Sequence, residues 1–313
     1  MHDKPRKSRE LLVLQSLLPR MKLSLEEKKH TDNLEKGYNG EIAFYQQLNE
    51  TPLKNQTILY DLLLPSNKTE FQLDSLFIEK NKIYLFEIKN YEGDFYIQQD
   101  NWYVAANGKE IRNPLSQLKR SEFLLRQLLH KWGYTISIEP YVIFINPEFT
   151  LYQTPLHQPI IFPTQLNRFF KKLLASNPEI TQNQKALSEK FATHHIENSS
   201  YEQLPEYEYD QLRKGMTCPC CKNFLIPKTF HILLCEHCHR EIKAETSVIE
   251  HIAEFHLLFP ERKITTKAIY EWCGGILSKK IIRRILTENF IFIDRGGFSY
   301  YLLKNNSMGN FII

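Results

Sequence analysis

Residues 71–91 read FQLDSLFIEKNKIYLFEIKNY and contain two strand-like segments, Phe71 to Glu79 and Lys82 to Tyr91. The second segment is continuously apolar at residues 83–86, which is typical of a strand buried on both faces. In a hairpin about Asn81, residues whose numbers sum to about 161 or 162 face each other, so Asp74 lies opposite Glu87 or Ile88. We therefore expect a hairpin that brings two carboxylates together at one end of a sheet.

The segments on either side of this hairpin predict a mixed α/β fold. Apolar spacing indicates helices over residues 34–48, 115–132 and 164–174. Residues 57–64 and 138–146 have the composition of strands, and residues 95–106 that of a small hairpin. The expected order is therefore helix, three strands, helix, strand.

Three ionisable residues belong to the expected hairpin. Glu87 and Lys89 are two apart, so their side chains leave the same face of the strand, and Asp74 is expected beside them. Neighbouring carboxylates are costly without a cation, and oxygen ligands of this kind suit Mg²⁺ or Mn²⁺. A lysine beside such a metal can polarise water or stabilise charge that develops on a phosphorane. The spacing alone leaves open an ordinary salt bridge between Glu87 and Lys89, because Glu-x-Lys is frequent by chance.

Four ordered motifs resemble the nuclease-related domain, or NERD, over about residues 34–174. They are GYNGE at 37–41, Asp74, EIKN at 87–90 and NPLSQ at 113–117. This family is related to the restriction-endonuclease-like PD-(D/E)xK phosphodiesterases, so the resemblance implies an α-β-β-β-α-β core. It also implies an active site of five residues: Glu41, Asp74, Glu87, Lys89 and Gln117. The residue before Asp74 is Leu73 rather than proline, which matters little because a proline there is not a ligand.

The resemblance gives each of these residues an expected role. Asp74 and Glu87 hold the divalent metal, with the Ile88 carbonyl as a candidate third oxygen. Lys89 activates the attacking water. Glu41, after a turn at Gly37 and Gly40, either orients Lys89 or completes a second metal position.

Gln117 is expected at the start of the long helix, which Asn113-Pro114 begins with proline at or near the first helical position. There it positions a phosphate or the water. The alternative is that Gln117 caps the end of the helix.

Four of the six cysteines form two C-x-x-C pairs separated by 13 residues: Cys218, Cys221, Cys235 and Cys238. Two such pairs joined by a hairpin are typical of a zinc ribbon, and a Cys₄ site is structural because no ligand position is left open. A rival ligand set has the spacing of a C₂H₂ finger: Cys235, Cys238, His251 and His256. We favour the four cysteines, because the rival set leaves Cys218 and Cys221 without a role.

Residues 266–303 predict a helix, a turn at Gly274-Gly275, a basic helix and a hairpin around residues 295–297. This order resembles a winged helix-turn-helix, whose second helix approaches the major groove while the hairpin touches phosphate. The expected nucleic-acid contacts are Lys279, Lys280, Arg283, Arg284 and Arg295. The alternatives are a solvated face of a small packing domain and a protein-interaction module.

The chain has 313 residues and a net charge of +4, which is concentrated at one end. Residues 210–313 hold 15 Lys/Arg and 10 Asp/Glu, a net of +5, which leaves −1 for residues 1–209. We expect an N-terminal helical extension (1–33), a NERD domain (34–175), a linker (176–214), a zinc ribbon (215–244) and a winged-helix-like domain (245–313). The sequence has neither an apolar window of membrane length nor a signal-peptide pattern, so we expect a cytoplasmic protein.

Together these features predict a metal-dependent nuclease that hydrolyses phosphodiester bonds, with catalytic Mg²⁺ or Mn²⁺, structural Zn²⁺, and DNA favoured over RNA as the partner. The competing hypothesis is a non-catalytic nucleic-acid-binding or regulatory protein that retains the fold. A protein-interaction scaffold is the weaker third hypothesis.

Overall fold

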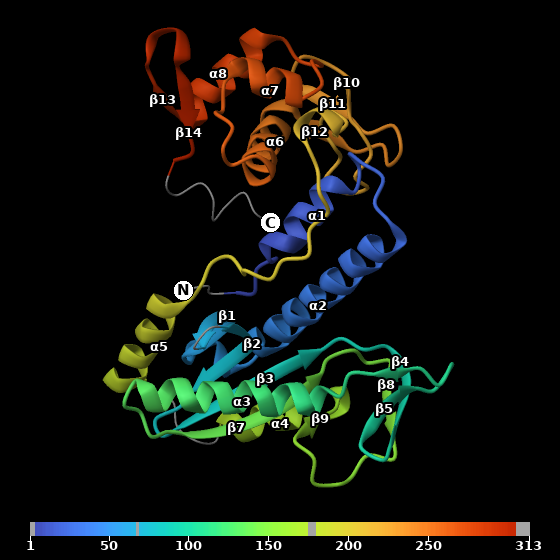
Figure 1. Cartoon of the computed structure of the whole chain (residues 1–313), viewed down its shortest axis with the longest axis vertical. Helices are drawn as coiled ribbons and strands as arrows, with labels where there is room; N and C mark the ends of the chain where they lie inside the picture. Colours follow the sequence, from blue (N-terminus) through green and yellow to red (C-terminus); the bar gives the residue numbers. More distant parts are fainter. Residues whose placement is uncertain (1–3, 67–68, 175–179, 305–313) are drawn as a thin grey trace. The chain divides into compact units, whose positions relative to one another are not determined.

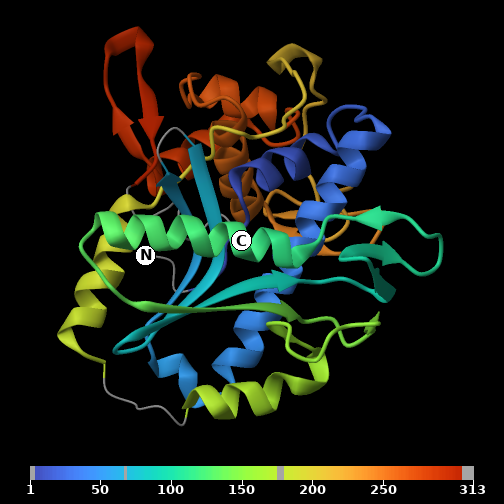
Figure 2. The same ribbon diagram turned by 60° about the horizontal axis from the view of Figure 1, so that its bottom comes forward.

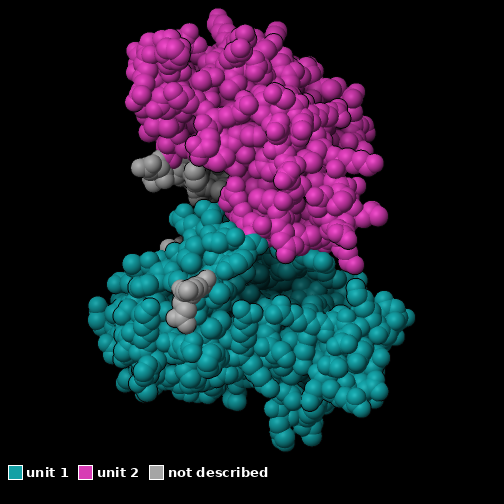
Figure 3. All heavy atoms as spheres, viewed as in Figure 1, with its two compact units in different colours: residues 1–6, 33–201 teal, residues 7–32, 202–313 magenta. Residues whose placement is uncertain are grey.

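The computed structural model describes residues 4–66, 69–174 and 180–304, and the chain forms two compact units (Figure 3). Unit 1 comprises residues 1–6 and 33–201, and unit 2 comprises residues 7–32 and 202–313. The long helix α2 (Leu25–Asn49) begins in unit 2 and ends in unit 1. No helix in the described parts of the chain combines the length and hydrophobicity needed to cross a membrane.

Unit 1 is built on a five-stranded sheet with the order β1-β2-β3-β7-β9 (Figure 1). Three strands run antiparallel: β1 (Ile58–Ser66), β2 (Thr69–Ile78) and β3 (Lys82–Lys89). Two more continue the sheet in parallel with β3: β7 (Ser137–Phe144) and β9 (Ile160–Ile161). In the β2–β3 hairpin Ser75 pairs with Phe86 and Leu76 with Leu85, which confirms the predicted register about Asn81.

Helices cover both faces of this sheet (Figure 2). On one face α3 (Pro114–Lys131) and α5 (Gln182–His194) share a core with Ile83 and Leu85 of β3. On the other face α2 and α4 (Leu166–Leu174) share a core with Tyr84 and Phe86. Alternate β3 residues thus enter opposite cores, which explains why residues 83–86 are continuously apolar. The predicted order α-β-β-β-α-β is confirmed.

A smaller four-stranded sheet with the order β6-β5-β4-β8 completes unit 1. Its strands are β4 (Gly93–Gln98), β5 (Asn101–Val104), β6 (Glu110–Ile111) and β8 (Phe149–Tyr152). Gln99 and Asp100, both with positive φ, form the turn of the predicted β4–β5 hairpin. Two short 3₁₀ helices also belong to this unit: η1 (Pro52–Asn55) and η2 (Pro163–Gln165).

Unit 2 packs four helices around one hydrophobic core: α1 (Arg9–Leu17), α6 (Ala244–Leu258), α7 (Thr266–Trp272) and α8 (Lys279–Asn289). A three-stranded sheet has Cys218 and Cys221 before its first strand and Cys235 and Cys238 between its second and third: β10 (Ile226–Pro227), β11 (Ile232–Leu234) and β12 (Glu241–Lys243). The hairpin of β13 (Ile291–Ile293) and β14 (Tyr300–Leu302) follows α8. Two 3₁₀ turns complete the unit: η3 (Tyr209–Gln211) and η4 (Gly296–Phe298).

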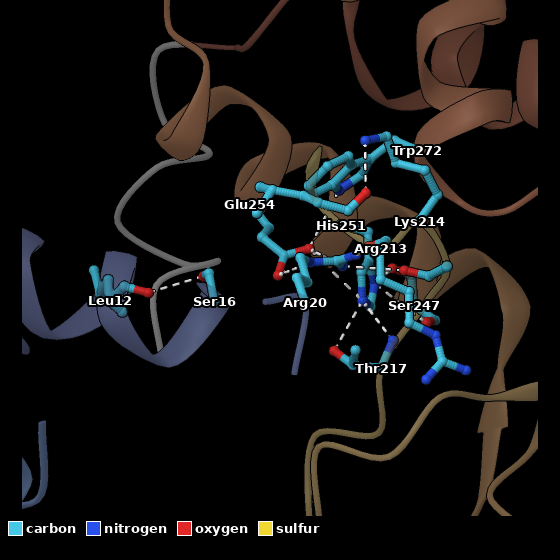
Figure 4. A network of polar contacts seen from close by, with 12 residues as sticks. Leu12, Ser16, Arg20, Arg213, Lys214, Thr217, Ser247, His251, Glu254 and Trp272 are labelled. Carbon is cyan, nitrogen blue, oxygen red and sulfur yellow. Dashed lines mark hydrogen bonds and ion pairs between the residues drawn. The ribbon is translucent and has the colours of Figure 1, made fainter. Parts of the chain in front are cut away.

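A buried ion pair joins the segment after α1 to the rest of unit 2 (Figure 4). The Arg20 guanidinium lies 2.6 Å from Oε2 of Glu254 in α6, and Trp272 Nε1 donates to the same oxygen. Arg20 also donates to the backbone carbonyls of Arg213 and Gly215. Because Arg20 lies 4.2 Å from the centre of the Trp272 ring, its charge is held by both ionic and cation–π contacts.

Candidate functional site

Glu41 reaches the sheet because α2 crosses the end of β3 at close range. A Cβ atom on Gly40 would lie 2.6 Å from Cβ of Asn90, so only glycine fits at this crossing. Asn90 Nδ2 also donates to the Lys36 carbonyl of α2, at 2.9 Å. The expected turn at Gly37 and Gly40 is wrong, because α2 continues through both glycines. Glycine here serves close packing rather than chain reversal.

The backbone of β3 holds the Asp74 side chain at the end of that strand. Its Oδ2 accepts a hydrogen bond from the Ile88 N–H at 2.7 Å, which is the cross-strand placement expected from the hairpin register. Burial raises the pKa of Asp74, while the charge of Lys89 and the Ile88 hydrogen bond act in the opposite direction. The carboxylate therefore lies in a poorly solvated position at the β2–β3 end of the sheet.

Lys89 joins Glu87 of its own strand to Gln117 of α3. Its Nζ donates to Glu87 Oε1 at 2.7 Å and to Gln117 Oε1 at 3.2 Å. Burial raises the pKa of Glu87, and the charge of Asp74 raises it further. Although Lys89 acts in the opposite direction, the resulting pKa is about 7. Burial alone would lower the pKa of Lys89, but the neighbouring carboxylates raise it, so the lysine stays charged. The ammonium group is thus a hydrogen-bond donor fixed among carboxylates.

The helix-cap alternative for Gln117 does not match the observed contacts. Asn113 is the N-cap of α3, where its side chain accepts from the Leu115 N–H at 2.9 Å and Pro114 begins the helix. Gln117, one turn further on, directs its side-chain oxygen to Lys89. The NPLSQ motif therefore both starts α3 and supplies a partner for the lysine.

Asp61 is a fourth acidic residue of this site, and the sequence reasoning missed it. It lies on β1 between the pairs Tyr60–Ser75 and Leu62–Leu73, opposite Asp74, with a φ of 49°. Burial and then the charge of Asp74 raise the pKa of Asp61 to about 6. The available signal was one carboxylate within the apolar run LYDLLL at residues 59–64.

Glu41 belongs to the same electrostatic cluster. Burial raises its pKa well above the ordinary value, and the charges of Asp74 and Asp61 raise it further. The site thus contains four carboxylates with raised pKa values and one lysine.

The carboxylates offer the hard oxygen donors that suit Mg²⁺ or Mn²⁺. Burial raises the pKa values of Glu41, Asp74 and Glu87, and the charge of Asp74 raises those of Glu41 and Glu87 further; a divalent cation would offset that charge. Over the described residues, however, the four cysteines are the one group of three or more possible ligands that lie within 4.8 Å of one another. Glu41, Asp74 and Glu87 are therefore less tightly grouped, with the Lys89 ammonium at Glu87. The oxygen donors are of the kind that binds Mg²⁺ or Mn²⁺. Their present spacing is the one in which the Lys89 ammonium occupies the position beside Glu87.

The four ribbon cysteines form a compact cluster in unit 2. Sγ of Cys218 lies 3.6 Å from that of Cys238, and Sγ of Cys221 lies 3.3 Å from that of Cys235. Four thiolates around zinc, with Zn–S bonds of about 2.3 Å, place their sulfurs about 3.8 Å apart in a tetrahedron. The cluster therefore has the dimensions of a tetrahedral metal site.

The two cysteine pairs repeat the same backbone turn. The N–H of Lys222 donates to the Cys218 carbonyl at 2.9 Å, and the N–H of His239 donates to the Cys235 carbonyl at 2.8 Å. Both donors have positive φ, 60° and 56°. The two turns bring the four sulfurs within 4.8 Å of one another, as in a zinc ribbon.

His251 of the rival ligand set is a core residue with its ring nitrogens occupied. Its Nε2 accepts from the Thr217 N–H at 2.8 Å, and its Nδ1 lies 2.6 Å from the Ser247 carbonyl (Figure 4). The histidine is 4 % exposed, and burial lowers its pKa. These contacts favour the four-cysteine set over the C₂H₂ set.

The five basic residues expected to touch nucleic acid lie on α8 and the hairpin that follows it. Lys279, Lys280, Arg283 and Arg284 are exposed on α8, while Ile282 and Ile285 on its other face are buried. Arg295 lies in the turn between β13 and β14. The predicted amphipathic division of this helix is confirmed.

A comparison with known proteins completes this description. Neither a curated protein nor a solved structure shows significant similarity to the chain. One family model does match, and its range includes Glu41, Asp74, Glu87, Lys89 and Gln117. Residues 36–145, which lie in unit 1, match the family model of NERD, the nuclease-related domain.

Proposed function

We propose that unit 1 is a metal-dependent nuclease that hydrolyses phosphodiester bonds of nucleic acid, DNA in preference to RNA. The observation that carries this proposal is the Lys89 ammonium held by Glu87 and Gln117, close enough to Asp74 for each to shift the other's pKa. A nuclease-related domain matched over residues 36–145 supports the same reaction class.

Asp74 and Glu87 would hold Mg²⁺ or Mn²⁺, with the Ile88 carbonyl as a third oxygen, and the bound metal would polarise the phosphoryl oxygen and offset developing charge. The Lys89 ammonium would orient and polarise the attacking water by donating a hydrogen bond. Gln117 would fix the direction of that donor, because its side-chain oxygen accepts from Nζ. Glu41 would either orient Lys89 or contribute to a second metal position.

Unit 2 would contribute to nucleic-acid binding. Its zinc ribbon would be structural, and the basic face of α8 with Arg295 would contact phosphates in a winged-helix-like arrangement. The net charge of +5 on residues 210–313 supports this division of roles.

Cleavage assays on single-stranded DNA, duplex DNA and RNA, with and without added Mg²⁺ or Mn²⁺, test this proposal. We expect metal-dependent cleavage that falls at least about 100-fold in Asp74→Ala. The matched control is Asp94→Ala, which removes an exposed aspartate from the same unit. Unchanged cleavage by Asp74→Ala would contradict the assigned site. Binding of nucleic acid without cleavage of any substrate would favour the non-catalytic alternative.

A further inference from the structure

A pocket of about 560 Å³ lies in unit 2, where the first turns of α7 and α8 meet the β13–β14 hairpin. That volume is within the range of about 300 to 1,000 Å³ that is usual for small-molecule sites. The residues that define its chemistry are Lys279, Lys280, Arg283, Phe292, Ser299 and Tyr301. It is therefore large enough for a nucleotide.

The charge of this pocket suits an anion. Lys279, Lys280 and Arg283 all line it, and no acidic side chain does so among the described residues. The three cations lie in the first turns of α8, where unpaired backbone N–H groups and the helix dipole add partial positive charge. The one acidic residue of the hairpin, Asp294, accepts hydrogen bonds from the Gly296 N–H and the Ser299 hydroxyl in the turn. The pocket thus concentrates positive charge from one helix end.

The hairpin lines the pocket with aromatic residues. Phe292 is 49 % exposed and packs on Tyr301, with ring centres 5.2 Å apart. An exposed aromatic ring beside phosphate-binding cations is the arrangement with which proteins bind single-stranded nucleic acid, because every unpaired base has a free face for stacking. In a duplex the base faces are covered by neighbouring pairs and cannot stack on Phe292.

We infer that this pocket binds a nucleotide of single-stranded nucleic acid, with its phosphate on Lys279, Lys280 and Arg283 and its base stacked on Phe292. The inference deepens the proposed function, on which it rests for the choice of nucleic acid as the ligand. It divides the basic residues into two groups, because Arg284 and Arg295 do not line the pocket. The contribution of each basic residue to binding in the pocket is thus expected to depend on where it lies as well as on its charge.

Fluorescence anisotropy of labelled single-stranded DNA of about 20 nucleotides, and of the matching duplex, tests the inference. The full-length Asp74→Ala protein is used, so that binding is measured whether or not the protein cleaves nucleic acid. We expect Arg283→Ala to weaken single-strand binding at least about tenfold, and Phe292→Ala at least about fivefold. Arg284→Ala, which removes the same charge from the same helix but from outside the pocket, is expected to weaken single-strand binding less than Arg283→Ala does.

Further variants separate stacking and free-anion binding from simple charge attraction. Phe292→Tyr is expected to retain single-strand binding, and Phe292→Ala is expected to leave duplex binding unchanged. Equal losses for Arg283→Ala and Arg284→Ala would overturn the pocket. No effect of Phe292→Ala on the single strand would overturn base stacking. A third outcome is that inorganic phosphate binds the pocket but Arg283→Ala binds single strands as well as the protein with Arg283 does. The pocket would then be a site for a free anion, and the inference would be overturned.

Discussion

The Nζ atom of Lys89 lies 2.7 Å from Oε1 of Glu87, and the two side chains are 17 % and 3 % exposed. They share a face of β3 because side chains two apart on a strand point the same way. A buried ion pair of this kind depends on both partners, since removing one leaves the other charge without compensation. The pair therefore couples the expected water-activating group to an expected metal ligand.

Lys89→Met is expected to reduce metal-dependent cleavage by about 100- to 10,000-fold, the range typical for loss of a group that assists proton transfer. The variant removes the only cation that hydrogen-bonds to Glu87 in the described structure and is expected to raise the pKa of that carboxyl further from its present value of about 7. Rates of cleavage under saturating Mg²⁺ measure the effect. Lys109→Met, at an exposed lysine of unit 1, is the control. Full activity in Lys89→Met would remove Lys89 from the mechanism.

Gln117→Leu is expected to reduce cleavage by about tenfold while leaving the stability of α3 almost unchanged. The substitution deletes one acceptor for Lys89, at 3.2 Å, but leaves the Glu87 contact and the helix cap intact. Asn113→Ala should show the reverse pattern, because loss of an N-cap costs about 1 kcal/mol of stability. Thermal unfolding and cleavage rates are measured for both variants. If Gln117→Leu lowers stability but not activity, Gln117 has the structural role.

Asp61→Asn is expected to make unit 1 more stable at pH 7 without added divalent metal, but not at pH 4. The pKa of Asp61 is raised from 3.8 to about 6 in the folded protein, so the unfolded state loses its proton first as pH rises. Wild-type stability therefore falls between about pH 4 and 6, and the penalty persists above pH 6. Two pKa units correspond to about 3 kcal/mol, and partial solvation reduces this to about 1 to 2 kcal/mol.

Hydrogen exchange of β1 and β2 peptides, compared between Asp61→Asn and the wild type at the same pH, measures this difference for unit 1. Asp94→Asn, at an exposed aspartate, should show no such pH dependence. A stabilisation that is equal at pH 4 and pH 7 would mean that Asp61 is not forced to ionise at a cost in the folded state.

The β2–β3 hairpin was predictable because a local pattern determines its register. The short connection at Asn81 fixes the pairing of β2 with β3, which aligns Asp74 with the end of β3. Asp61 could not be found in this way. Its positive φ and its position opposite Asp74 arise from the pairing of β1 with β2, and the one local signal, a carboxylate within an apolar run, does not say which residue it faces.

Tertiary contacts between distant segments were also beyond the sequence. Arg20 and Glu254 are 234 residues apart, and no pattern in the sequence around either residue indicates that the two form an ion pair. Gly40 was recognised as part of a motif, but a turn was expected there because glycine is common in turns. Its actual reason is the approach of Asn90, which only the packed structure reveals.

One zinc ion per chain is expected by elemental analysis, and Cys221→Ser should lose it. Four thiolates held within 4.8 Å of one another need a cation to offset their charge. Loss of zinc should destabilise unit 2 by several kcal/mol, because binding of a structural metal is coupled to folding. Cys220→Ser is the matched control, since that exposed thiol is outside the cluster. Zinc loss in His256→Ala would instead support the C₂H₂ ligand set.

Arg20→Met is expected to destabilise unit 2 by about 3 to 5 kcal/mol, because it leaves the Glu254 carboxylate buried without its partner. Hydrogen exchange of α6 peptides measures the loss. Lys267→Met breaks an exposed pair with Glu271 in the same unit, and it should change stability by less than about 1 kcal/mol.

The double variant Arg20→Met/Glu254→Leu should recover part of the loss caused by Arg20→Met, since it removes both charges together. If the single variant costs less than about 1 kcal/mol, Arg20 does not hold the segment after α1 in place. If the double variant is no more stable than Arg20→Met, the hydrogen bonds of Arg20 to the Arg213 and Gly215 carbonyls, rather than its charge pair, hold that segment.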